Sequence, residues 1–130
     1  ILDAVEDKPT SDDDRCMFDL GIYICLSVVG LVGKAFPENC VNPSGHWHYP
    51  VGGFMGWHTN SDAPFERLYL VYSETGESWF KYRDPVTSEI VSVQDNKGWN
   101  VYNFTTPDDQ LFWHCVYSEC NRFSFGFRIV

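Results

Sequence analysis

The sequence predicts a single, mainly β domain in which short antiparallel strands form a sandwich or a barrel. The chain has 130 residues, which is the length of one domain. Aromatic residues make up 17% of it, and large rings pack well on the faces of sheets. After residue 45, short runs of β-branched and aromatic residues recur between clusters of turn-forming residues, which is typical of an antiparallel sandwich or barrel.

The chain begins with an acidic segment. Residues 1–14 are rich in Asp and Glu and contain one basic side chain, Lys8. A charge run with so few apolar residues cannot build a core and is typical of a mobile arm. We therefore expect a flexible acidic arm over residues 1–14 and one folded domain over residues 15–130.

Residues 17–36 predict one N-terminal helix, from Met17 to Phe36. Ser11 and the aspartates after it are suited to cap a helix, and Phe18, Ile22 and Val29 follow a helical period. The same stretch also alternates as a strand does, but its length and the cap favour a helix.

Short strands are expected through the rest of the chain. They are Phe54–His58, Arg67–Ser73, Ser78–Tyr82, Glu89–Gln94, Trp99–Phe104, Leu111–Tyr117 and Phe123–Val130. The turn clusters between them are Glu74–Glu77, Arg83–Thr87, Asp95–Gly98, Thr106–Asp109 and Ser118–Asn121. Their Gly, Pro, Asp and Asn residues terminate strands and form tight turns.

Charge and cysteine spacing limit the classes of partner. The net charge of −9 repels phosphate backbones, so we expect no nucleic-acid partner. The longest uncharged run, Leu20–Gly33, is shorter than the roughly 20 residues that span a bilayer, so we expect no membrane partner. The five cysteines have no CxxC or zinc-knuckle spacing and fit reduced thiols in a cytoplasmic protein.

Histidines mark the candidate chemistry. His58 ends a glycine-rich strand, and His114 lies in the apolar run LFWHCVY. Arg122 and Ser124 follow His114 on the next expected strand. By the two-residue period of a strand, Arg122 and Ser124 lie on one face.

This order of motifs resembles the Fe(II)- and 2-oxoglutarate-dependent oxygenases. The residues that carry the resemblance are Gly56–Asn60, Arg67–Tyr72, Gly98–Phe104, Trp113–Val116 and Asn121–Phe127. It covers residues 45–130, and the small size is similar to compact members of the superfamily found in phage and bacterial genomes. The resemblance implies a double-stranded β-helix, or jelly roll. It also implies an enzyme that hydroxylates a substrate with O₂ and converts 2-oxoglutarate to succinate and CO₂.

The resemblance assigns His58 and His114 as two Fe(II) ligands. The family places Asp or Glu as the third ligand, where this chain has Asn60. Two imidazoles and one carboxylate leave open positions for a 2-oxoacid and O₂. Three interpretations stay open: Asn60 binds through its carbonyl oxygen, Asp62 replaces it, or the site is not catalytic.

The resemblance also implies a clamp for 2-oxoglutarate. Arg122 is suited to bind a carboxylate with two parallel hydrogen bonds, and Ser124 shares that role in some family members. Tyr69 is expected to add a phenol hydrogen bond from the neighbouring strand. We expect Arg122 to be buried and to have no Asp or Glu partner, since its counter-ion would be the ligand.

A second pair of histidines, His46 and His48, has a spacing also used by metal-binding cupins. No Glu follows at the cupin distance, so we favour a loop over residues 46–49 that covers the mouth of the barrel. On either interpretation His46 and His48 are expected to line a substrate pocket near His58. Trp99 and Tyr102 lie on the strand before His114. Core packing accounts for such an aromatic strand position, and the alternative is that the two rings flank a bound substrate.

Two classes of function follow. The first is an Fe(II)- and 2-oxoglutarate-dependent oxygenase that acts on a small-molecule or peptidyl substrate. The second is a non-catalytic jelly-roll or cupin-like binding module, or a structural module of a phage. The third metal ligand separates them, because Asn60 leaves the site without the usual negative charge.

Overall fold

The computed structural model describes residues 15–20, 30–59, 66–105 and 111–130. Within them, ten strands form two antiparallel sheets of five strands each. The first sheet has the order β1-β4-β9-β6-β7 and the second has the order β2-β3-β10-β5-β8. The strands are β1 (Arg15–Cys16), β2 (Phe18–Asp19), β3 (Val41–Tyr49), β4 (Phe54–His58), β5 (Glu66–Ser73), β6 (Ser78–Arg83), β7 (Ile90–Gln94), β8 (Gly98–Thr105), β9 (His114–Ser118) and β10 (Arg122–Ile129).

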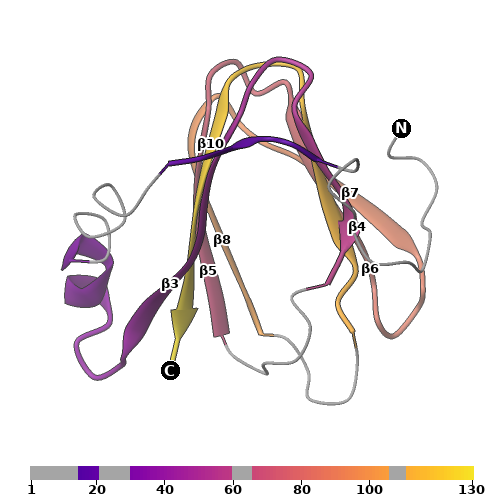
Figure 1. Cartoon of the computed structure of the whole chain (residues 1–130). Helices are drawn as coiled ribbons and strands as arrows, with labels where there is room; N and C mark the ends of the chain where they lie inside the picture. Colours follow the sequence, from indigo (N-terminus) through magenta and orange to yellow (C-terminus); the bar gives the residue numbers. More distant parts are fainter. Residues whose placement is uncertain (1–14, 21–29, 60–65, 106–110) are drawn as a thin grey trace.

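The two sheets form a jelly roll, which confirms the expected fold class. The connections β3–β4, β5–β6, β7–β8 and β9–β10 each cross from one sheet to the other. They gather at one end of the molecule, where the sheets come together, and the sheets diverge toward the opposite end (Figure 1). We call these the narrow end and the wide end.

Most of the strands follow the sequence prediction. The predicted strand Phe54–His58 coincides with β4, and β5 to β10 each overlap a predicted strand. Residues 46–49, which were predicted to form a loop, are instead the last part of β3. Pro43 is accommodated because β3 pairs with β10 through an irregularity between Phe125 and Phe127.

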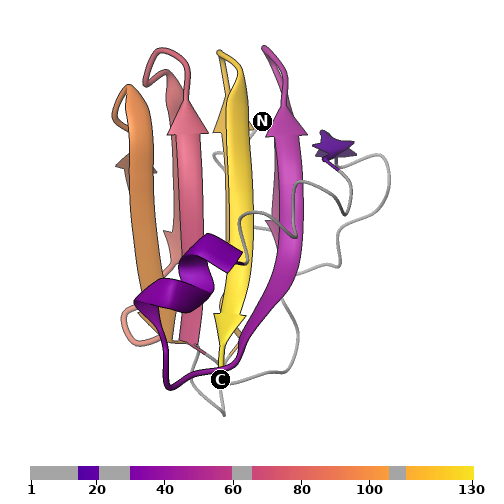
Figure 2. The ribbon, with the colours of Figure 1, turned by 90° about the vertical axis from the view of Figure 1, so that its left-hand side faces the viewer.

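The N-terminal helix prediction is correct only at its end. Phe18–Asp19 forms β2, which pairs with β3, so the predicted helix does not begin at Met17. Residues 30–35 are helical, whereas residues 21–29 lie outside the described part of the chain. Figure 2 shows the helix lying across the outer face of the second sheet.

An apolar core lies between the helix and the outer face of the second sheet. Val32 of the helix packs there with side chains from two strands; these are Leu68, Phe125, Phe127 and Ile129. Because side chains alternate along a strand, the residues between them point to the interior between the sheets. The inner face of β10 therefore carries Arg122, Ser124 and Arg128.

Two further predictions concern the thiols and the membrane. Among the described cysteines, Cys16, Cys40, Cys115 and Cys120 are all free thiols, and Cys25 lies outside the described residues. In the described part of the chain, no helix is both long and apolar enough to span a membrane. The acidic arm predicted over residues 1–14 also lies outside the described residues.

Candidate active site

His58 and His114 face each other at the wide end. They are paired residues of β4 and β9, at the last and first positions of these strands. Their ring centroids are 4.2 Å apart and the rings are tilted by 58°. Thus two imidazoles that are distant in the sequence meet inside the jelly roll, as the shared metal site predicted for them requires.

Hydrogen bonds to the main chain set the tautomer of both rings. The Nδ1–H of His58 donates to the Gly56 carbonyl at 2.7 Å, and that of His114 donates to the Phe112 carbonyl at 2.9 Å. A neutral imidazole that donates from Nδ1 carries its lone pair on Nε2. Nε2 is therefore the atom of each ring that is available to a metal ion, and hydrogen bonds of this kind also orient metal-binding histidines.

His114 is held in its neutral form. Burial lowers its pKa to about 3, and the neighbouring His58 and the positive charge of Arg67 act in the same direction. Metal ions bind the deprotonated imidazole, so no proton has to be displaced from His114 near neutral pH.

Both candidates for a third metal ligand lie outside the described residues. Asn60 and Asp62, the two candidates, both lie in the undescribed segment 60–65. Within the described ranges, no group of three His, Cys, Asp or Glu side chains could hold a metal ion. The described residues thus bring together two of the predicted metal ligands, His58 and His114, and imidazole nitrogens suit a divalent metal ion such as Fe(II).

Aromatic rings fill the interior between the His58–His114 pair and the narrow end. Phe80 of the first sheet lies 5.6 Å from the His114 ring and 6.4 Å from the Phe104 ring of the second sheet. Tyr69 stacks on Phe104 at 5.7 Å, and Tyr102 stacks on Phe80 at 6.2 Å. These half-buried rings line the middle of the barrel and give it apolar walls.

Arg122 lies at the narrow end and is paired with an acid, which corrects the prediction that it has no Asp or Glu partner. Arg122 is 2% exposed, and its Nε donates to Oδ2 of Asp95 at 2.8 Å. Its guanidinium also lies 5.5 Å from the centre of the Tyr49 ring. A buried guanidinium is costly without a counter-ion, and the turn after β7 supplies one.

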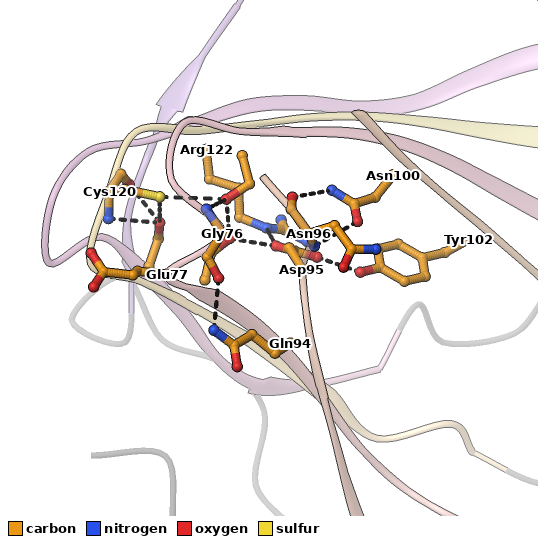
Figure 3. A network of polar contacts seen from close by, with 12 residues as sticks. Gly76, Glu77, Gln94, Asp95, Asn96, Asn100, Tyr102, Cys120 and Arg122 are labelled. Carbon is orange, nitrogen blue, oxygen red and sulfur yellow. Dashed lines mark hydrogen bonds and ion pairs between the residues drawn. The ribbon is translucent and has the colours of Figure 1, made fainter. Parts of the chain in front are cut away.

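Asp95 is the centre of a polar network that joins the two sheets (Figure 3). Besides Arg122, it accepts hydrogen bonds from Ser78 Oγ at 2.5 Å and from the Tyr102 hydroxyl. Burial is the main reason that the pKa of Tyr102 is raised, and its hydrogen bond to Asp95 adds to the shift. Ser73 extends the network by contacting Ser78 Oγ at 2.8 Å.

The other predicted cosubstrate residues share the inner face with Arg122. Ser124 is buried on β10, and Tyr69 lies on β5 across from Gly126. A Cβ atom at Gly126 would come within 2.8 Å of Cε1 of Tyr69. The missing side chain therefore makes room for the Tyr69 ring in the interior.

His46 and His48 lie on the outer face of the second sheet, not in a pocket with His58. His46 packs edge-on against Phe125 and Phe127, and His48 stacks on Phe123 at 4.6 Å. The alternation of side chains along β3 puts both rings on the face away from the interior. The sheet itself separates them from His58. The prediction that His46 and His48 line a substrate pocket near His58 is therefore wrong.

Acidification is expected to destabilise the fold partly through His46. Burial lowers the pKa of His46 below its ordinary 6.5, so the unfolded chain takes up this proton first as the pH falls. Stability is therefore lost as the pH falls through 6.5, by at most about 1.4 kcal/mol per pH unit. Urea unfolding at about pH 7 and about pH 5 should show that His46→Gln loses less free energy of unfolding between the two pH values than wild type does. An equal loss in wild type and variant would contradict this expectation.

Trp99 also lies on the outer face, whereas Tyr102 points inward to Asp95. Trp99 is 64% exposed and belongs to a row of rings that crosses the second sheet. The row runs through Phe18, His48, Phe123, Tyr72 and Trp99, with neighbouring centroids between 4.6 and 6.4 Å apart. Trp99 therefore does not flank a substrate beside His114.

Two residues of the interior were missed by sequence reasoning. Asp95 was assigned only to a turn, and nothing in the sequence names its partner Arg122. Arg67 belongs to a predicted strand and to the family resemblance but has no predicted role, although it is two residues from Tyr69 and must share its face. The strand period was thus a usable signal for Arg67, whereas Asp95 carried none.

A search of solved structures matches the chain to the crystal structure of a Pseudomonas putida prolyl-4-hydroxylase. The TM-score is 0.56, and the match covers 94% of this chain and 76% of that chain. The two proteins share a fold. Sequence identity is 13%, so the likeness concerns the fold alone. No protein-family model matches the sequence, and no curated protein matches it.

Proposed function

We propose that the chain is an Fe(II)- and 2-oxoglutarate-dependent oxygenase that hydroxylates a small-molecule or peptidyl substrate and releases succinate and CO₂. The observation that carries the proposal is the His58–His114 pair, with both Nδ1 atoms bonded to main-chain carbonyls at the wide end of a jelly roll. The fold shared with a prolyl-4-hydroxylase supports it.

In this function His58 and His114 hold Fe(II) through Nε2, and Asn60 or Asp62 completes the ligand set. Bound iron and 2-oxoglutarate supply the oxidising chemistry that places oxygen on a C–H bond. The chain's own part is to orient the two imidazoles through their main-chain hydrogen bonds. The rings of Phe80 and Phe104 provide an apolar surface beside His114.

Arg122, Ser124 and Tyr69 are proposed as the clamp for 2-oxoglutarate. Asp95 fixes Nε of Arg122, so the two Nη groups are the donors with which Arg122 would bind a carboxylate. Asp95 thereby orients the guanidinium, and it also offsets the charge that would attract the cosubstrate. We expect binding of 2-oxoglutarate to depend on the metal as well as on Arg122.

Titration with Mn²⁺, followed by electron paramagnetic resonance of the free ion, tests the metal site. Wild type is expected to bind Mn²⁺ weakly, and His114→Ala should abolish binding because it removes a neutral nitrogen ligand. Asn60→Asp should bind more tightly, since it adds a negative charge to the ligand set. If Asp62 is the third ligand, Asp62→Ala abolishes binding instead and Asn60→Asp changes little.

His48→Ala is the matched control, because it removes a histidine from the outer face of the second sheet. It should bind Mn²⁺ as wild type does. If neither wild type nor Asn60→Asp binds Mn²⁺, the oxygenase is excluded, and the non-catalytic binding module is the function that accounts for the fold.

A further inference from the structure

Arg67 lies in the interior at the wide end, near the His58–His114 pair. It is the second residue of β5, and its partners across the second sheet are Phe104 on β8 and Arg128 on β10. Leu68, the next residue, packs in the outer core, so the Arg67 side chain leaves from the inner face. The ring of its partner Phe104 lies 5.0 Å from the ring of Phe112, which in turn lies 5.5 Å from the His114 ring.

Arg67 is a buried cation with an unmet hydrogen bond. It is 4% exposed, and its Nε is buried without a hydrogen-bond partner among the described residues. Arg122, which is also buried in the interior, has Asp95 as its counter-ion. Burial of a guanidinium without such a partner is unfavourable, so Arg67 is suited to receive an anion from outside the chain.

The neighbours of Arg67 favour a carboxylate on an organic group. Arg128, directly across on β10, adds a second positive charge on the same face. The Phe104 ring beside it offers an apolar wall, which contacts Phe112 at 5.0 Å. A planar guanidinium binds a carboxylate with two parallel hydrogen bonds, and the rings accommodate the carbon skeleton attached to it.

We propose that Arg67 binds the carboxylate of an acidic organic substrate between the two sheets, beside His58 and His114. This inference deepens the proposed function and rests on it for the metal that would act on the bound molecule. It assigns a second carboxylate subsite at the wide end, apart from Arg122 at the narrow end. The substrate class is thus a small organic acid or an acidic side chain.

Isothermal titration with succinate, on the full chain with and without Mn²⁺, tests the subsite. Arg67→Met is expected to weaken succinate binding about 10- to 100-fold, which is the usual effect of losing a charge-assisted hydrogen bond. Arg67→Lys should recover part of the affinity, because it keeps the positive charge but cannot donate two parallel hydrogen bonds to a carboxylate. Lys97→Met, which removes an exposed charge at the narrow end, should bind succinate as wild type does.

Thermal unfolding without ligand separates ligand binding from a structural role. Arg67→Met should unfold at a higher temperature than wild type, because it removes a buried charge that lacks its counter-ion. A variant that is less stable than wild type, or that fails to fold, would show that Arg67 supports the fold and would overturn the proposal. Unchanged succinate affinity in Arg67→Met, or no binding by wild type, would also overturn it.

Competition with saturating 2-oxoglutarate identifies the source of the carboxylate. Succinate that still binds in its presence occupies a separate site, as a substrate carboxylate would. Succinate that is displaced assigns Arg67 to the cosubstrate and overturns the assignment to substrate. Mn²⁺ binding by Arg67→Met should match that of wild type. If neither wild type nor any variant binds Mn²⁺, the proposed oxygenase function is excluded. The succinate titration without metal then still shows whether Arg67 binds a carboxylate.

Discussion

Asp95→Ala is expected to lower the free energy of unfolding by about 3–5 kcal/mol, since it leaves the buried Arg122 charge without its partner. The pair is 2.8 Å apart, and the two side chains are 2% and 0% exposed. Ser78 and Tyr102 lose their acceptor in the same substitution, so the contact between the two sheets at the narrow end is lost as well. Urea unfolding of wild type and Asp95→Ala measures the effect.

The double variant Asp95→Leu with Arg122→Met is the control. Replacing both charges with apolar groups of similar size removes the desolvation cost together with the attraction, so it should recover most of the lost stability. The same double variant should lose affinity for 2-oxoglutarate, because the proposed clamp is gone. A loss below about 1 kcal/mol for Asp95→Ala would mean that the ion pair does not hold the narrow end.

Local patterns predicted the strands from β4 onward because each has the period of a sheet and ends at a turn cluster. The pattern failed at β3, where Pro43, Ser44 and Gly45 are typical of a turn. That strand is stabilised by its pairing with β10, a contact between residues far apart in the sequence. It failed again at Phe18, where pairing with β3 outweighs a local preference for helix.

The site was predictable only in part, for the same reason. His58 and His114 were found through a family resemblance, and their register across β4 and β9 puts them together. The choice of face was the weaker step, since the sequence does not show which side of the sheet the helix covers, and the expectation that His48 and Trp99 lie at a substrate pocket was wrong. Because both faces of the second sheet carry apolar and aromatic side chains, hydrophobic alternation alone does not distinguish them.

Phe127→Ala is expected to destabilise the protein by about 3–5 kcal/mol, because it opens a cavity in the outer core. Phe127 is 0% exposed and packs with Val32 of the helix and with Leu68. It also contacts the edge of the His46 ring at 5.2 Å, so its loss removes packing from three segments of the chain. Thermal or urea unfolding of the variant measures the cost.

Trp99→Ala is the matched control, because it removes a larger ring from the same face at a position that is 64% exposed. Its cost should stay near 0.5 kcal/mol, the usual range for surface substitutions, with its contact to Tyr72 as the main loss. The difference in unfolding free energy between the two variants measures how much packing against the helix stabilises this face of the sheet. If both variants lose the same free energy of unfolding, the helix adds no packing there. The second sheet is then stabilised from its inner face, which lines the candidate active site.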